Sequence, residues 1–387
     1  MRLACLAAVL VVLAAGCSAG GATTSGRPAA TAASGAPPAS TPAPTPTPAP
    51  QLTLSGLFHP AGPVSGDPSH LRTMIATGDV IPARLVNEAA TRRGDFVWPF
   101  RPTADYVRSA DVTFINLESP LLAGCPVRVV GGDFCGDPRW VEGLTAIGTK
   151  VANVANNHVY AGPNTERTQA LLEQNGIKVS THLGPPALLE VRGLRFAFVG
   201  VSAVSTGNAG DPQAPPVDRA ALKADIEHAR QQADVVVVQF HWGKEYERQP
   251  QPAGGIAPDD PIELGHLAID SGADFVVGNH PHWVQGVEIY KNKLITYAHG
   301  NYVFDQVNCY PSIGPDYRTY CSDDTRTSVI GTYTFYDNHL VAASWRPTFI
   351  DTALQTQWAD PGRSAQVLRT MEEASVQLAQ KEGEPTS

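Results

Sequence analysis

The most informative part of the chain is Ala273-Asp274-Phe275-Val276-Val277-Gly278-Asn279-His280-Pro281-His282. Its apolar first half predicts a buried strand. In α/β folds, ligands bind in the loops that leave the carboxyl ends of strands. Two histidines one residue apart in such a loop can direct their rings toward one metal ion or toward two adjacent ones, and neutral imidazole is the commonest metal ligand. The alternative is a turn with two half-exposed histidines.

Similar strand ends occur at four other places in the sequence. Strands are predicted over 73–79, 111–117, 150–155 and 234–240, and each ends in polar residues or is followed by them. If these strands are parallel, their ends meet at one rim. One cluster can then contain Asp79, Glu118, Asn157, His241, His280 and His282. Each residue alone has an ordinary alternative as a turn, a cap, a loop charge or a core histidine. Their recurrence at successive strand ends favours a metal site.

Strand and helix patterns alternate along much of the chain. Helices are predicted over 83–93, 164–174, 216–233, 260–271 and 361–380. Further strands are predicted over 177–180, 188–191, 194–201 and 275–278. Four consecutive antiparallel strands are then expected at 286–290, 293–297, 328–336 and 339–347. This order indicates an α/β sandwich, with a mixed sheet or two sheets covered by helices.

The first 51 residues predict export of the protein. Residues 1–16 have a weakly basic tip and an apolar stretch too short to span a bilayer, as in a signal peptide. They lead into Leu13-Ala14-Ala15-Gly16-Cys17, which resembles a bacterial lipobox. We therefore expect Cys17 to be lipidated and to anchor a lipoprotein at the cell membrane, with ordinary secretion as the alternative. Residues 17–51, rich in Ala, Pro and Thr, predict a disordered tether, which leaves a folded domain over 52–380.

Charge and cysteine content narrow the class of protein. Loss of Arg2 with the signal peptide changes the net charge from −9 to −10. The chain also has no run of Lys and Arg, which argues against a nucleic-acid partner. Four cysteines beyond residue 17 in an exported protein suggest two disulfides. The favoured pairs, each around a loop of Gly, Pro and Asp, are Cys125–Cys135 and Cys309–Cys321. A four-cysteine metal site is the weaker alternative, because zinc sites favour shorter spacings.

Six motifs lie in order between residues 73 and 350: Gly78-Asp79, Asn116-Leu117-Glu118-Ser119-Pro120, Ala155-Asn156-Asn157-His158, His241-Trp242-Gly243-Lys244-Glu245-Tyr246, Gly278-Asn279-His280-Pro281-His282 and Gly300-Asn301-Tyr302-Val303-Phe304-Asp305. Together they resemble the bacterial CapA family of poly-γ-glutamate capsule synthesis proteins. This family is part of the calcineurin-like metallophosphoesterase superfamily. The resemblance implies a four-layer α/β sandwich and a centre of two divalent metal ions.

By this resemblance, Asp79 and His282 would hold one metal ion. The other would be held by Asn157, His241 and His280, with Glu118 in the bridging position. His158 matches the catalytic histidine of the superfamily, and Arg84 would bind an anionic group, an exposed helix arginine being its alternative. Mixed oxygen and nitrogen ligands suit Mn, Fe or Zn.

Three positions depart from the superfamily pattern. Ile81 stands where phosphoesterases carry a histidine that binds the first metal ion, so this ion loses a ligand and a single-metal site becomes an alternative. Glu118 replaces the usual aspartate, as in capsule-type relatives. Ala161 occupies a position where relatives often carry aspartate, which leaves the orientation of His158 open.

The resemblance implies a membrane-tethered, extracytoplasmic protein. It would serve the synthesis, export or anchoring of polyglutamate or another anionic envelope polymer, together with membrane proteins of capsule synthesis. Three functions remain open at this point: an amide hydrolase acting on γ-glutamyl or peptide polymer, a metallophosphoesterase acting on an envelope phosphoester, and a non-catalytic accessory subunit.

Overall fold

The computed structural model describes residues 51–128, 134–159, 162–205, 216–307 and 320–383. The chain divides into two units, Met1–Thr47 and Pro48–Ser387, and the fold described here is that of the second unit. The predicted signal peptide, the lipidation site Cys17, residues 17–50 of the tether, and Cys309 lie outside the described residues. These assignments therefore stay predictions.

The first sheet has seven strands in the order β15-β14-β13-β1-β3-β4-β5. Its parallel strands are β1 (Leu71–Ala76), β3 (Val112–Asn116), β4 (Thr149–Asn153) and β5 (Lys178–Ser180). Antiparallel strands extend the sheet beyond β1, namely β13 (Thr327–Tyr336), β14 (His339–Ile350) and β15 (Thr356–Trp358). The carboxyl ends of β1, β3 and β4 consequently lie at one edge.

The second sheet has six strands in the order β10-β11-β9-β8-β7-β6. Four of them run parallel, namely β7 (Leu194–Ser202), β8 (Val235–His241), β9 (Phe275–Asn279) and β11 (Lys293–Thr296). The edge strands β6 (Ala187–Val191) and β10 (Val287–Tyr290) pair antiparallel with their neighbours. His241 and Asn279 are register partners at the ends of β8 and β9.

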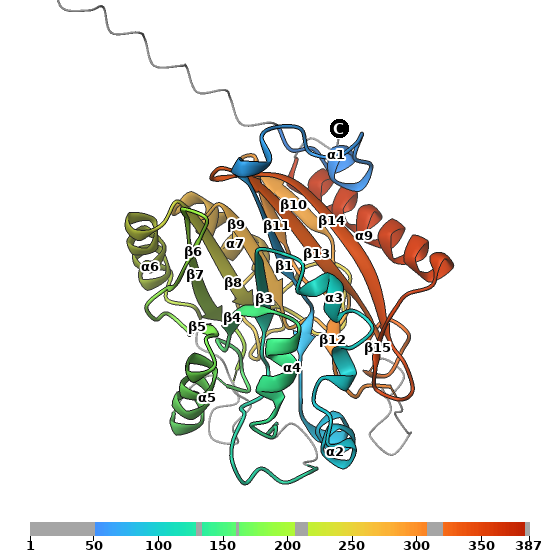
Figure 1. The fold of residues 1–387 in the computed structure, drawn as a ribbon. Helices are drawn as coiled ribbons and strands as arrows, with labels where there is room; N and C mark the ends of the chain where they lie inside the picture. The colour runs from blue at the N-terminus through green and yellow to red at the C-terminus, as the bar shows by residue number, and fades with distance from the viewer. Residues whose placement is uncertain (1–50, 129–133, 160–161, 206–215, 308–319, 384–387) are drawn as a thin grey trace, which may run out of the picture. The chain divides into compact units, whose positions relative to one another are not determined.

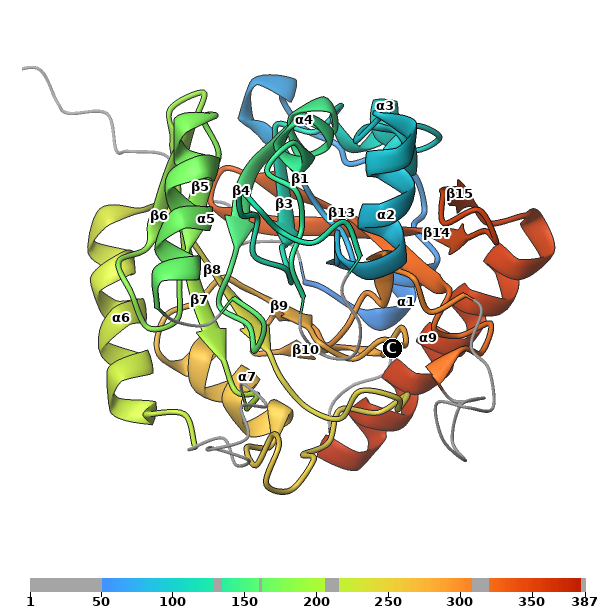
Figure 2. The same cartoon turned by 90° about the horizontal axis from the view of Figure 1, so that it is seen from below.

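The two sheets pack face to face and helices cover both outer faces, so the four-layer α/β sandwich is confirmed (Figures 1 and 2). Side chains from both sheets form the apolar cluster between them, including Phe114, Phe198 and Tyr333. The outer face of the first sheet is covered by α2 (Arg84–Arg93), α3 (Ala104–Val107), α4 (Trp140–Ala146) and α5 (Pro163–Gln174). That of the second sheet is covered by α6 (Arg219–Gln232) and α7 (Pro261–Asp270).

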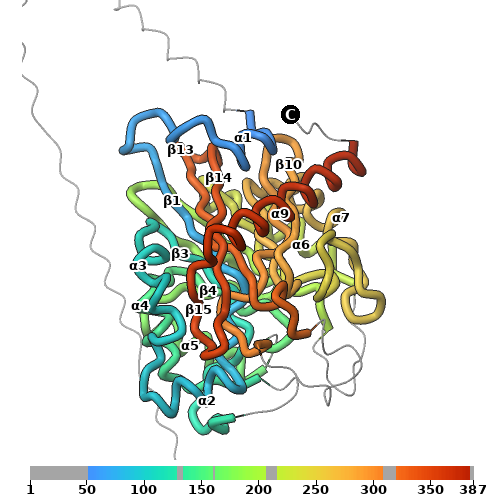
Figure 3. The backbone as a smooth tube through the Cα atoms, turned by 90° about the vertical axis from the view of Figure 1, so that its right-hand side faces the viewer, coloured from blue at the N-terminus to red at the C-terminus, as the bar shows by residue number. Residues whose placement is uncertain are grey.

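The predicted closing helix is present as α9 (Pro361–Glu382). It contacts β10 of one sheet and β14 of the other, as Figure 3 shows, and it also packs against α1 (Leu54–Phe58). Two of its buried residues, Met371 and Ala379, belong to the cluster between the sheets. The helix therefore covers one side of the inter-sheet core.

Local sequence explains the main elements. β8 is buried along its whole length, and its four consecutive valines suit a parallel strand covered on both faces. The helices α6, α7 and α9 follow Asp218, Asp260 and Asp360, whose side chains accept hydrogen bonds from backbone N–H groups of the first turn. These caps satisfy donors that a helix start leaves without an intrahelical partner.

Two expectations about the strands are wrong. The four strands after residue 286 do not form one antiparallel run, because β10 and β11 belong to the second sheet while β13 and β14 belong to the first. The first strand ends at Ala76, and Asp79 lies in a separate two-residue strand, β2 (Asp79–Val80), which pairs with β12 (Asn301–Val303). In both cases long-range pairing, which local periodicity does not encode, decides the outcome.

The predicted disulfide Cys125–Cys135 is present. Cys321 is also disulfide-bonded, but its predicted partner Cys309 lies outside the described residues. Among the helices in the described part of the chain, none is long and apolar enough to cross a bilayer.

Candidate metal centre

Strand ends of both sheets bring three buried side chains together: Glu118, His241 and His280. Each offers one ligand atom, and these three atoms lie within 4.8 Å of one another. His241 ends β8, Glu118 follows β3, and His280 follows β9. We call these three residues the ligand cluster. The sequence-based expectation that strand ends converge here thus holds for these three residues.

His241 Nε2 is the centre of the ligand cluster. It lies 3.3 Å from Glu118 Oε1, 3.1 Å from His280 Nδ1 and 2.8 Å from Asn157 Oδ1. Asn157, from the loop after β4, therefore lies beside the cluster as predicted. The four groups form a compact set of oxygen and nitrogen atoms with no thiolate, which is the donor set that Mn, Fe or Zn accepts.

Two buried atoms of the ligand cluster have no hydrogen-bond partner among the described residues, namely Glu118 Oε2 and His280 Nε2. A buried polar atom without a partner is costly, and native structures rarely retain one without a reason. A divalent cation would remove this cost for each of the two atoms that it coordinated. His280 also has a φ of 95°, a left-handed conformation that a histidine adopts only at a cost in free energy, as residues at functional sites often do.

Asp79 lies next to the ligand cluster and is held by amide groups. Its Oδ1 accepts hydrogen bonds from Asn116 Nδ2 and Asn279 Nδ2, both at 2.8 Å. Its Oδ2 accepts from the backbone N–H of His280 at 3.3 Å. These donors fix the orientation of the carboxyl group, so Asp79 is placed to serve as a ligand through Oδ2.

His282 is set apart from the ligand cluster. Its ring centroid is 6.3 Å from that of His280, and its Nδ1 lies 2.9 Å from Asn301 Oδ1. Its ring packs near those of Tyr246 and Phe304, with centroids 5.3 Å away in both cases. Of the six predicted ligands, four therefore lie together, namely Glu118, Asn157, His241 and His280. Asp79 and His282 lie at the periphery of this group.

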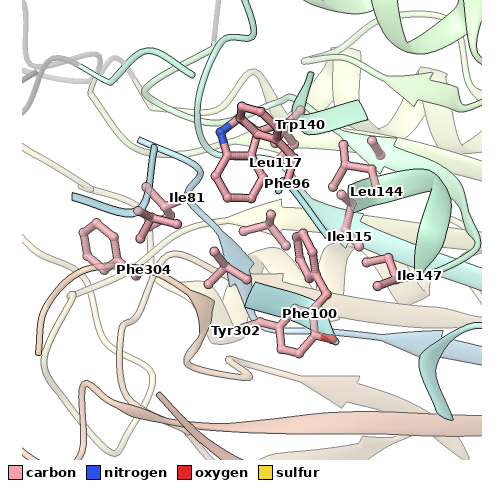
Figure 4. Close-up of a cluster of buried hydrophobic side chains, with 14 of the residues drawn as sticks. Ile81, Phe96, Phe100, Ile115, Leu117, Trp140, Leu144, Ile147, Tyr302 and Phe304 are labelled. Atoms are coloured by element: carbon pink, nitrogen blue, oxygen red, sulfur yellow. The ribbon is translucent and has the colours of Figure 1, made fainter. Parts of the chain in front are cut away.

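Ile81 gives a physical reason for this asymmetry. Its side chain is fully buried in the apolar cluster beneath the helices of the first sheet, on the side of Phe304 in Figure 4. It offers no ligand atom where phosphoesterases have a histidine. A first metal ion would therefore rely on Asp79, His282 and the shared carboxylate Glu118.

His158 lies beside the ligand cluster. Its Nε2 is 3.7 Å from Glu118 Oε1 and 3.3 Å from Asn157 Nδ2. This nitrogen therefore faces the ligand cluster. Asn156 shapes the loop, because its Oδ1 accepts the backbone N–H groups of His158 and Val159.

Arg84 is neither a simple exposed helix arginine nor an isolated cation. Its guanidinium forms an ion pair with Asp305, and its Cζ lies 5.1 Å from the ring centroid of Phe134 and 4.8 Å from that of Phe304. The backbone N–H of Leu85 also donates to Asp305. The predicted role in binding an anionic group would require that group to compete with Asp305.

Burial dominates the electrostatics of the site. It raises the pKa of the Asp79 carboxyl to about 7, and the neighbouring Glu118 carboxyl adds to this rise. It raises the pKa of Glu118 well above its usual range, with Glu245 adding to the effect. It lowers the pKa of His241 and of His282 to about 4, and it lowers the pKa of His280 well below its usual value. The imidazoles are therefore neutral, as metal ligands must be, and a cation would draw the carboxyl groups into their ionised form.

The sequence matches the family model described as "Bacterial capsule synthesis protein PGA_cap" over residues 73–306. This range covers more than half of the chain and includes the ligand cluster, Asp79, His158 and His282. The chain belongs to the PGA_cap family. The resemblance to CapA proteins is thereby confirmed.

Named relatives agree with this assignment. The chain is 30% identical over 278 residues to "Capsule biosynthesis protein CapA" of Bacillus anthracis, covering 63% of this chain and 62% of that one. It is 29% identical over 249 residues to "PGA biosynthesis protein CapA" of Bacillus subtilis, covering 59% and 62%. The matched region spans less than two thirds of the length of these relatives.

Among solved structures, a hypothetical protein from Thermus thermophilus matches with a TM-score of 0.43 and 19% identity. The match covers 71% of this chain and 98% of that one.

Several residues that orient the site had no predicted role. Asn116, Asn279, Asn301 and Asp305 all lie in the recognised motifs, yet only the structure shows that they hold Asp79, His282 and Arg84. The sequence indicated these residues only by their position, since each lies within three residues of a predicted ligand or inside the last motif. Their hydrogen-bond partners could not be predicted from the sequence.

Metal affinity should rise with pH around neutrality. Asp79 must be ionised to bind a cation, and its folded pKa of about 7 means that protons compete with the metal below this pH. For each proton that the metal displaces, we expect the affinity to fall by about 10-fold with every pH unit below 7. Calorimetry at pH 6, 7 and 8, in two buffers of different ionisation heat, measures the metal affinity and the number of protons released on binding. Asp79→Asn, which cannot ionise, should reduce the dependence to the part that Glu118 contributes, whereas an affinity equal at pH 6 and pH 8 in the wild type would contradict this account.

Proposed function

We propose that this protein is a metal-dependent hydrolase that acts on poly-γ-glutamate or another anionic polymer of the cell envelope, as part of its synthesis, export or anchoring. The observation that carries this proposal is the ligand cluster, with its two buried atoms that lack a partner among the described residues. The names of the Bacillus relatives, which refer to capsule and PGA biosynthesis, supply the choice of polymer.

The residues of the chain divide the work as follows. Glu118, His241, His280 and Asn157 would hold one divalent ion, and Asp79 and His282 would hold a second, with Glu118 shared between the two. A bound ion supplies Lewis-acid polarisation of the carbonyl oxygen of the scissile bond. During hydrolysis of a γ-glutamyl amide, the oxygen of water bonds to the carbonyl carbon as the carbon–nitrogen bond breaks. His158, whose Nε2 faces the ligand cluster, would donate the proton to the departing nitrogen.

We place this reaction outside the cytoplasm, at a membrane. The lipobox-like Cys17 and the tether behind it would hold the domain beside the membrane, within reach of membrane proteins of capsule synthesis. The disulfide Cys125–Cys135 supports this location, because such bonds persist in oxidising compartments. Labelling of intact cells with a fatty-acid probe, compared between wild type and Cys17→Ala, tests the anchor directly.

The chemistry can be tested on purified protein loaded with Mn²⁺ or Zn²⁺. We expect the protein to hydrolyse short γ-glutamate oligomers and to show no comparable turnover of p-nitrophenyl phosphate. Chromatography of the released glutamates measures the first reaction. His158→Ala should lower kcat by about 100-fold while the metal content stays unchanged, because the proton donor alone is lost. Turnover of the phosphate ester instead would identify a phosphoesterase. Metal binding without either activity would identify an accessory subunit.

A further inference from the structure

We propose that Phe134 positions the imidazole of His158, and that the disulfide Cys125–Cys135 holds Phe134 in place for this task. The proposal rests on the proposed function in one respect, since it takes His158 as the proton donor. It adds a positioning residue and a covalent support that the family resemblance does not supply.

The contact between the two rings is close and parallel. The centroids of Phe134 and His158 lie 3.9 Å apart, with 23° between the ring planes. Phe134 also packs edge-on against Phe304 at 5.9 Å and lies beneath the guanidinium of Arg84. A stacked neighbour restricts rotation of the imidazole about its side-chain bonds, which keeps Nε2 directed toward Glu118 and Asn157.

Phe134 itself is held by its neighbours in the chain. Cys135, the next residue, is joined to Cys125. Gly136 then donates to the carbonyl of Pro120 at 2.8 Å and accepts from the N–H of Leu122 at 3.0 Å. One covalent bond and two backbone hydrogen bonds therefore attach the segment 134–136 to the segment 120–125. Such a crosslink limits the conformations available to the loop residues it joins.

Asn87 of α2 adds a second support from the helix layer. Its Oδ1 accepts from the N–H of Asp137 at 3.0 Å and from Trp140 Nε1 at 2.9 Å. Its Nδ2 donates to the carbonyl of Val127 at 2.9 Å. One buried amide thus ties a residue inside the disulfide loop, Val127, and two residues after the loop, Asp137 and Trp140, to the same helix, which supports the segment that carries Phe134.

This arrangement answers a question left by the sequence. Relatives often carry aspartate where this chain has Ala161, and a carboxylate there would orient the catalytic histidine by a hydrogen bond. Alanine cannot do so. The stack on Phe134 adds orientation through ring contact to the contacts that His158 Nε2 makes with Glu118 and Asn157, and it occupies no ring nitrogen.

The first test measures the position of the ring and needs no activity. Protein with isotope-labelled histidine is loaded with Zn²⁺, and His158 signals are assigned with His158→Ala. Stacking should shift the ring protons of His158 upfield. Phe134→Leu, which keeps an apolar side chain, should abolish this shift, Phe134→Tyr should retain it, and Cys125→Ser/Cys135→Ser should reduce it. The zinc content should be equal in all four proteins. His158 signals in Phe134→Leu that coincide with the wild type would overturn the proposal.

The second test uses the reaction. If His158 is misplaced, substrates with poor leaving groups should suffer most, since they depend on protonation. We expect Phe134→Leu to lower kcat about 10- to 100-fold on γ-glutamyl alkylamides, with little change in KM or on activated p-nitroanilides. Phe134→Leu should cost nothing further in a His158→Ala background. Equal losses on both substrate types would overturn the positioning role. Absence of hydrolysis by the wild type, with the ring shift present, would instead remove the proposed function and leave the stacking intact.

Discussion

Replacing Glu118 or His280 with alanine should lower the affinity for divalent metal by more than about 100-fold. Loss of a residue that only hydrogen-bonds to a metal ligand typically lowers the affinity by about 10- to 100-fold, and loss of a ligand itself should lower it more. Both residues belong to the ligand cluster, and each carries a buried atom without a partner among the described residues. Metal analysis of purified wild type and variants, followed by competition with a chelating dye, measures the change. We expect up to two equivalents in the wild type.

Two variants separate loss of a ligand from loss of the fold. Glu118→Gln keeps the shape of the side chain but removes a carboxyl group whose pKa burial raises well above its usual range. The metal-free variant should therefore be at least as stable as the metal-free wild type at pH 8, although its metal affinity falls. His70→Ala removes a histidine that is paired with Asp337 at the surface, and it should leave metal content unchanged. Full metal retention by both Glu118→Ala and His280→Ala would contradict the assignment of the ligand cluster as a metal site.

Gly278→Ala should destabilise the protein by about 3 kcal/mol, at the upper end of the usual cost of overpacking. Gly278 lies in β9 between two neighbouring strands. A Cβ atom at this position would lie 2.0 Å from the carbonyl oxygen of Tyr297 and 2.5 Å from Trp242 Nε1. These two groups form a buried hydrogen bond of 2.9 Å, which the methyl group would push apart. The strand that carries His280 would shift with it.

Urea unfolding of the metal-free and metal-loaded proteins measures this effect. Gly62→Ala is the matched control, because a Cβ there meets no atom within 4 Å, and its stability should change by less than about 0.5 kcal/mol. Metal affinity of Gly278→Ala should also fall, since His280 follows two residues later. Equal unfolding midpoints for Gly278→Ala and Gly62→Ala would show that β9 accommodates the methyl group.

Much of the architecture follows from short stretches of sequence. The run of valines in β8, the proline and aspartate at the starts of α7 and α9, and the hairpin of β6 and β7 all depend on neighbouring residues. The same holds for the strand-end positions of Glu118, His241 and His280, because polar residues follow apolar strands in the chain. Family motifs then added the expectation of a metal centre, and the disulfide Cys125–Cys135 followed from its spacing and the exported context.

The order of residues therefore specifies which segments form strands and helices and which strand ends carry metal-ligand groups, because those properties depend on residues close together in the chain. The three-dimensional fold was needed to establish which groups meet. Asn279 donates to Asp79 across 200 positions, and the disulfide loop brings Phe134 onto His158. Such contacts depend on how two sheets pack and on which strands pair, and a local pattern carries no information about either.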